Sequence, residues 1–110
     1  MRLSVALRAA SARDANELLE TLRYLMTTTR QEPGCLECSA WSERDSTVHY
    51  NEGWATELDV RRRVRSTGFT SLLAVMECAT EPPIVQFDFV TVTRGLDFVE
   101  EVRGAAREQG

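Results

Sequence analysis

The chain has 110 residues, of which 43% are hydrophobic and 27% are charged, and its formal net charge is −4. This length is enough for one compact domain, and the composition is ordinary for a soluble globular protein. The acidic balance disfavours general affinity for nucleic acid, and the apolar runs fall far short of the ~20 residues that span a bilayer. We therefore expect neither nucleic acid nor a membrane as a partner.

The N-terminal stretch MRLSVALRAASA has some features of a secretory signal. However, Arg8 interrupts its apolar patch before it reaches the roughly 7–15 residues of a signal core. The chain also has three cysteines, an odd number that does not suit a secreted disulfide framework. We interpret the stretch as a strand and expect a cytoplasmic protein.

Alternation of apolar and polar residues predicts a first strand over residues 2–8. A helix is predicted from Ser11, which has Asp14 three residues later in a weak capping box, and leucines at helical spacing follow. Pro33-Gly34 should end this helix in a turn.

Two strands should come next, at about residues 35–42 and 48–54, joined by a polar hairpin connection at residues 44–46. The two-residue period of a strand predicts that side chains of the later strand divide between opposite faces. One face should carry Val48, Tyr50, Glu52 and Trp54, and the other His49, Asn51 and Gly53.

A second helical region is predicted from Thr56, where the capping-box pattern recurs, to a stop at Pro82-Pro83. Gly68 is expected to break or kink it. Residues 84–93, IVQFDFVTVT, form the most strand-like segment of the chain and predict a single strand. A short C-terminal helix should follow.

The predicted order is βαββαβ with an added helix. It indicates an α+β, ferredoxin-like fold with a four-stranded antiparallel sheet and helices on one face. We divide the chain into a main domain, residues 1–95, and a C-terminal helical extension, residues 96–110. Large apolar side chains predicted on both faces of the third and fourth strands suggest that the bare face is buried against a second copy of the chain.

Cys35 and Cys38 have the C-x-x-C spacing of redox dithiols and zinc knuckles. Three steps along a regular strand, however, span roughly 10 Å and reverse the side-chain direction. A disulfide requires Cα atoms within ~7 Å of each other. We interpret both as structural cysteines on opposite faces of the sheet, with a thiol or metal role as the alternative, and we predict no metal site.

Three stretches, in this order, carry a resemblance to a known family. They are Thr29-Arg30-Gln31-Glu32-Pro33-Gly34-Cys35, Glu52-Gly53-Trp54, and Arg63-Val64-Arg65-Ser66 with Phe69 after it. They are similar to the TR-x-EPGC, E-x-W and H-x-x-S-x-x-F segments of the antibiotic biosynthesis monooxygenase (ABM) family, and the likeness covers roughly residues 2–92. The resemblance implies a homodimer of ferredoxin-like subunits, a dimeric α/β barrel.

Arg63 departs from the family pattern, because many members have His at that position. A permanent cation thus replaces a group that titrates near neutral pH, so a mechanism that needs this His as a base does not transfer. The family includes cofactor-independent oxygenases of polycyclic aromatics, quinol oxygenases and haem-degrading enzymes. The haem-degrading members use an Asn in the first strand, and residues 2–8 contain none. Haem chemistry is therefore disfavoured.

Four residues are candidates for catalysis. The resemblance implies a pocket at Trp54, whose indole would stack on a flat aromatic substrate, although a core aromatic at a strand end is the alternative. His49 is the only imidazole available as a general base, and Asn51 shares its face, although most lone strand histidines are bystanders. Arg63 could bind an anion in the pocket, whereas acidic-to-basic pairs four residues apart on its helix favour a solvated face.

A second group of residues would bind the substrate if a pocket exists. Glu52 would orient a substrate hydroxyl or, as we favour, pair with an Arg. The apolar members are more often core residues than cavity walls. The group is Tyr50, Glu52, Phe69, Leu72 and Met76.

We therefore predict a homodimer that oxygenates an electron-rich aromatic, such as a quinol or an anthrone-like polyketide, with O₂ and without a cofactor. The chain has no Gly-rich phosphate loop and no clustered metal ligands in its sequence. The alternative is a non-catalytic dimer that binds a small molecule or serves a structural role.

Overall fold

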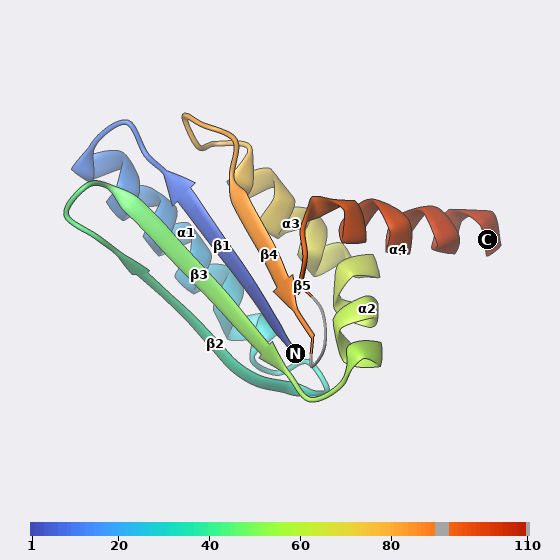
Figure 1. Cartoon of the computed structure of the whole chain (residues 1–110). Helices are drawn as coiled ribbons and strands as arrows, with labels where there is room; N and C mark the ends of the chain where they lie inside the picture. The colour runs from blue at the N-terminus through green and yellow to red at the C-terminus, as the bar shows by residue number, and fades with distance from the viewer. Residues whose placement is uncertain (90–92, 110) are drawn as a thin grey trace.

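The chain folds into one antiparallel sheet with helices packed against it, and a computed structural model describes residues 1–89 and 93–109, with side chains to residue 104 (Figure 1). The elements are β1 (Arg2–Arg8), α1 (Ala12–Thr29), β2 (Cys35–Ser42), β3 (Thr47–Trp54), α2 (Glu57–Arg65), α3 (Thr67–Met76), β4 (Ile84–Asp88), β5 (Thr93–Arg94) and α4 (Leu96–Gln109). None of the helices in these described ranges is long and apolar enough to cross a membrane.

The sheet has five strands in the order β2-β3-β1-β4-β5, and every neighbouring pair is antiparallel. The prediction of four strands is therefore wrong by one. The segment at 84–93 is not a single strand, because β4 ends at Asp88 and β5 pairs back onto it, with Phe87 opposite Arg94. Residues 90–92, which the single-strand prediction also covered, lie outside the described residues.

Figure 1 looks onto the bare face of the sheet, with α1 and α3 behind it. Alternate residues of β1 and β3 point into the helix layer, as their two-residue period predicts. They pack with the apolar stripe of α1, including Leu22 and Met26, and with Phe69 and Leu72 of α3. This layer is the core of the protein, and it also contains Glu52 and Arg63.

The second helical region is two helices, and they divide at Ser66 rather than at Gly68. Ser66 is extended (φ −74°, ψ 157°), so it ends α2 and begins α3. Its hydroxyl accepts a hydrogen bond from the backbone N–H of Phe69 at 3.2 Å. The break comes from this serine cap, which competes with helix continuation, and Gly68 lies in the first turn of α3.

A β-bulge interrupts β2 between Cys35 and Glu37 and changes the faces of its side chains. Cys35 is opposite Trp54 and Cys38 is opposite Glu52, two residues that share the helix-covered face. The predicted placement of the two cysteines on opposite faces is therefore wrong. The extra residue of the bulge turns the strand so that both side chains lie on the same face. All three cysteines are free thiols.

Helix α4 extends sideways from the sheet beside α2 (Figure 1). Its first half is anchored by Phe98, which is buried and contacts the ring of Phe87 with centroids 4.9 Å apart. Arg103 donates from Nε to the backbone carbonyl of Val64 at 2.8 Å, near the C-terminal end of α2. Helix α4 is thus fixed to the rest of the chain through residues between Phe98 and Arg103.

Candidate functional site

A carboxylate and a guanidinium are paired inside the core, between β3 and α2. Arg63 donates from Nη2 to Glu52 Oε2 at 2.8 Å and from Nε to both carboxylate oxygens at 3.2 Å. Neither side chain is more than 2% exposed. Such a pair tolerates burial only when its remaining donors and acceptors are also satisfied.

The rest of the network supplies those partners. Tyr50 donates its hydroxyl hydrogen to Glu52 Oε2, and Trp54 donates its indole N–H to Oε1 at 3.0 Å. Behind Tyr50, the Cys38 thiol donates to the Tyr50 oxygen at 3.4 Å. On the other side, Arg63 Nη2 donates to Thr29 Oγ1 at 3.3 Å. Every oxygen of Glu52 therefore has more than one donor.

The sequence positions these groups through simple periodicity. Tyr50, Glu52 and Trp54 are alternate residues of β3, so they project into the core side by side. The reciprocal capping box of Thr56 and Asp59 begins α2 directly after that strand, which fixes the helix against the strand end.

Arg63 lies on the inner side of α2, so the predicted solvated face is wrong for this residue. Asp59 pairs with Arg62 and not with Arg63, while the pair of Glu57 with Arg61, at 3.8 Å, follows the prediction. The prediction that Glu52 pairs with an Arg is confirmed.

Burial and the charge of Glu52 together fix the protonation states of Arg63 and Tyr50. Burial alone would lower the pKa of Arg63, but the hydrogen bonds and charge of Glu52 raise it above its ordinary value. Burial and the neighbouring Glu52 charge raise the pKa of the Tyr50 hydroxyl far above its ordinary range. Tyr50 therefore stays protonated and donates, and Arg63 stays cationic.

Glu32 brings this network to the surface. Its Oε1 lies 3.6 Å from Arg63 Nη1, and its side chain is 26% exposed, whereas that of Arg63 is 2% exposed. A tight turn holds it, because its N–H donates to the carbonyl of Thr29 and its carbonyl accepts from the N–H of Cys35, both at 3.1 Å. Gly34 completes the turn with φ +85°, a conformation that favours glycine.

Two hollows open on either side of Glu32. The first, which we call the Trp54 hollow, has a volume of about 230 Å³ and is lined by Glu32, Pro33, Trp54, Asp59, Arg62 and Ser66. The second, the Arg63 hollow, has a volume of about 190 Å³ and is lined by Tyr24, Leu25, Thr28, Thr29, Glu32, Arg63, Gly68 and Ser71. Glu32 is the residue that belongs to both.

The Glu32 carboxyl titrates differently from a surface carboxyl. Burial raises its pKa above the ordinary value of 4.5, and the charge of Glu52 adds to this, while Arg63 and Arg62 act in the opposite direction. Glu32 was not among the predicted site residues. Its position in the EPGC stretch was the available signal, because that turn joins the first helix to the strand beside Trp54.

His49 and Asn51 do not reach this region, because they lie on the bare face of the sheet. His49 stacks on Trp41, with ring centroids 5.2 Å apart, and its Nε2 is 3.4 Å from Glu43 Oε1 without the geometry of a hydrogen bond. The four predicted catalytic residues are thus divided between the two faces, and Trp54 and Arg63 alone meet around Glu52.

Phe69, Leu72 and Met76 are buried in the core cluster. None of them lines either of the two hollows beside Glu32. Phe69 carries the Arg63 guanidinium over its ring at 5.6 Å from the centroid, a favourable cation–π arrangement. Their position supports the core interpretation over that of a cavity wall.

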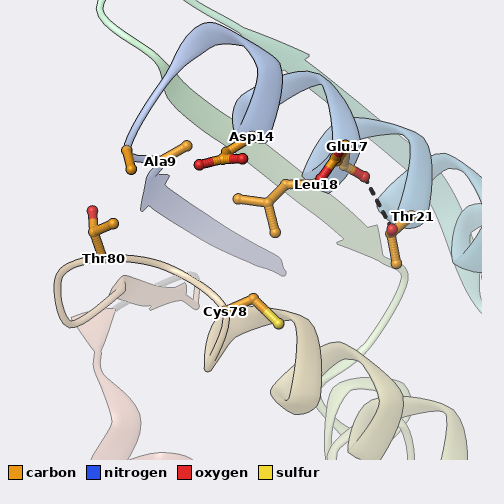
Figure 2. Close-up of a pocket in the computed structure, with 8 residues that line it drawn as sticks. Ala9, Asp14, Glu17, Leu18, Thr21, Cys78 and Thr80 are labelled. Atoms are coloured by element: carbon orange, nitrogen blue, oxygen red, sulfur yellow. Dashed lines mark hydrogen bonds between the residues drawn. The ribbon is translucent and has the colours of Figure 1, made fainter.

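Two further hollows lie elsewhere. One, of about 260 Å³, lies between the first half of α1 and the end of α3, where Asp14, Glu17 and Cys78 approach it (Figure 2). It begins at Ala9, just beyond the end of β1 that is remote from Trp54, roughly 20 Å along the strand. The other, of about 370 Å³, is lined by Arg30, Cys35, Leu36, Glu37 and Cys38. Among the described residues, no three His, Cys, Asp or Glu side chains are placed to hold a metal ion together.

Comparison with known proteins identifies the fold. No protein-family model matches the chain, and no curated protein matches it. Solved structures do. A protein described as an antibiotic biosynthesis monooxygenase is 21% identical, with 82% of this chain and 99% of that chain covered and a TM-score of 0.62. One from Caulobacter crescentus CB15, provisionally assigned the same activity, is 18% identical over 81% and 88% of the chains, with a TM-score of 0.66.

A third similar structure is a Bacteroides thetaiotaomicron protein of unknown function, suggested to be an oxidoreductase. It is 14% identical, covers 86% of this chain and 94% of that chain, and has a TM-score of 0.67. At these identities the likeness establishes a shared α+β fold. That several neighbours are described as antibiotic biosynthesis monooxygenases supports the resemblance found in the sequence.

Proposed function

We propose that this chain is an ABM-type monooxygenase that oxygenates a small electron-rich aromatic with O₂ and without a cofactor. The observation that carries the proposal is the Trp54 hollow, which Trp54, the Glu32 carboxyl group and Arg62 line beside the buried Arg63, although the Trp54 side chain itself is only 2% exposed. An aromatic wall with a few convergent polar groups is typical of a small-molecule site.

The chemistry needs little from the protein. An electron-rich phenol or quinol, once deprotonated, can pass an electron to O₂ itself. The protein has to position the substrate, exclude water and stabilise the anion. Trp54 would pack against the ring, while the positive charge of Arg62 and Arg63 would stabilise the anion that forms.

We further propose a homodimer of ferredoxin-like subunits in which the bare face of one sheet meets that of another. Trp41 is 43% exposed and Ile84 is 71% exposed on this face, so burying them would remove apolar surface from water. The face is less apolar than predicted, because its middle row is the polar set Ser39, Asn51, Ser4 and Gln86. Light scattering after size-exclusion chromatography tests the dimer, and a monomer at micromolar concentration would overturn it.

The activity is tested by O₂ uptake with a panel of hydroquinones and anthrones, measured above a blank without protein. The Trp54→Phe variant keeps an aromatic ring but loses the N–H bonded to Glu52. We expect wild-type uptake on at least one substrate and a lower rate for the variant. Uptake no greater than the blank over the whole panel would overturn the proposal.

A second candidate is a non-catalytic small-molecule-binding or structural module of the same shape. One observation favours it: Arg63 already directs Nε and Nη2 to Glu52 and Nη2 to Thr29, so the pair acts as a core support. The module predicts binding of a small aromatic with no O₂ uptake. The panel above separates the two functions.

A further inference from the structure

Glu32 occupies a position that the proposed chemistry requires and that no predicted residue fills. An oxygenase of a quinol needs a group that removes the hydroxyl proton. His49, the only histidine of the chain, lies on the opposite face of the sheet from Trp54. Glu32 instead lines the Trp54 hollow with a carboxyl group that is partly open to solvent.

The surroundings of Glu32 suit proton transfer. The Arg63 guanidinium is 3.6 Å away and is held from behind by Glu52, so a cation stays next to the place where negative charge would develop. The turn that carries Glu32 is fixed on the β3–α2 connection, because the Ala55 N–H donates to the Gly34 carbonyl at 2.9 Å. A side chain held in this way is pre-organised.

The charged and titratable groups around Glu32 come from four elements. They are Tyr24 on α1, Glu52 on β3, Cys35 at the start of β2, and Asp59, Arg62 and Arg63 on α2. Burial and the Glu52 charge raise the pKa of Glu32 against the effect of the two arginines. A carboxyl group with a raised pKa is a stronger base than an ordinary one.

We infer that Glu32 is the catalytic base of this site and takes the hydroxyl proton of a one- or two-ring quinol held in the Trp54 hollow. The inference rests on the proposed function. The substrate O–H bond breaks, an O–H bond forms on a Glu32 carboxyl oxygen, and the electron pair stays on the substrate oxygen as a phenolate. Electron transfer to O₂ is a later step.

The size of the hollow favours a small substrate. Cavities of about 150 Å³ accept benzene, and drug-sized ligands need about 300 Å³ or more. The Trp54 hollow, at about 230 Å³, lies between these limits. A substituted single ring or a fused pair of rings therefore fits it better than a three-ring anthrone.

The test compares wild type with Glu32→Gln, Glu32→Asp and the control Glu20→Gln, which removes an exposed carboxyl of α1. O₂ uptake with methylhydroquinone is followed as a function of pH. We expect wild-type kcat to rise with pH as Glu32 loses its proton. Glu32→Gln should lose this rise of kcat with pH, which is the acidic limb of the pH profile, and its kcat should fall roughly 100-fold or more. Glu32→Asp should keep the limb at a lower rate, and Glu20→Gln should match wild type. Glu32→Gln within twofold of wild type, with the limb intact, would overturn the inference.

A binding measurement separates failure of this inference from failure of the proposed function. 4-Nitrophenol is titrated into each protein, and the site is located by NMR shifts of the Trp54 indole N–H and the Glu32 amide. Suppose that wild type shows no turnover but binds 4-nitrophenol in the Trp54 hollow. If the pKa of the bound 4-nitrophenol then shifts in wild type and not in Glu32→Gln, the oxygenase proposal fails while the proton-accepting role of Glu32 stands. Binding elsewhere, no binding, or an equal pKa change in both proteins would overturn the role of Glu32. Thermal unfolding of each variant confirms that it is folded.

Discussion

Arg63 and Glu52, eleven positions apart in the sequence, meet inside the core through three N–H···O contacts of 2.8 to 3.2 Å. The contact joins the last turn of α2 to the C-terminal part of β3. A pair of this kind is costly to form in a core and more costly to break, because removal of one partner leaves the other charged and buried.

Arg63→Met should therefore be strongly destabilising. It would leave the Glu52 carboxylate with Tyr50 and Trp54 as its remaining donors, without a counter-charge. We expect a loss of about 3–5 kcal/mol in the free energy of unfolding, measured by urea denaturation. Arg62→Met is the matched control, because the Arg62 side chain is 55% exposed where it pairs with Asp59, and its loss should cost less than about 1 kcal/mol. Equal losses for the two variants would contradict the prediction.

Stability should also depend on pH through Glu32. Its folded-state pKa is raised above 4.5 mainly by burial, so between 4.5 and the raised value the folded chain binds more protons than the unfolded chain. The free energy of unfolding should accordingly fall as pH rises through this window. Glu32→Gln removes the contribution, so its free energy of unfolding should rise relative to wild type as the pH increases from 4.5 through the raised pKa. Urea denaturation at several pH values measures the difference in free energy of unfolding between the variant and wild type. A difference that does not change with pH would refute the prediction.

The two glycines Gly34 and Gly104 should respond in opposite directions to alanine. Gly34 has a positive φ, and a Cβ there would collide with the Asp59 carboxyl group, so Gly34→Ala should lower the melting temperature. Gly104 lies within α4, and a Cβ there would meet no atom within 4 Å. Gly104→Ala should stabilise the protein by roughly 0.5–1 kcal/mol through helix propensity. Calorimetry of both variants checks the contrast, and a shift of the same sign in both would contradict it.

The cysteines should react in a fixed order. Cys78 is exposed and Cys35 is half-buried, while burial raises the pKa of the Cys38 thiol to about 11. Because the thiolate is the nucleophile, Cys38 should be the slowest to be alkylated by iodoacetamide at neutral pH. Mass spectrometry of timed samples gives the order. Labelling of Cys38 before Cys35 would contradict the burial of the Cys38 side chain.

The sequence predicted much of this fold because its signals are local. Alternation in β3 assigned Glu52 to the covered face, and the caps of α1 and α2 marked where each helix begins. The errors come from features without a local signal. The acidic residues four positions before Arg61 and Arg63 suggest a solvated helix face, yet the Arg63 side chain turns inward because its strongest partner lies on another element. Residues 84–93 have uniform strand propensity, which does not show that β4 turns back into β5.

The candidate site was predicted only in part for a similar reason. Trp54 and Arg63 do lie together, but the three-dimensional placement of Glu32 depends on the turn at Gly34 and on the start of α2. His49 was chosen by residue type, although its own strand period already assigned it to the other face.

The bulge in β2 also affects how this chain should be aligned with others. A relative whose second strand is regular would be one residue shorter between Cys35 and Cys38 if its side chains faced the same way. In an alignment without a gap, each β2 residue on one side of the bulge would be matched with a residue of the relative whose side chain lies on the opposite face of the sheet. Aligning such chains with a one-residue gap at Leu36 would restore the correspondence, so C-x-x-C here and C-x-C elsewhere would describe the same pair of positions.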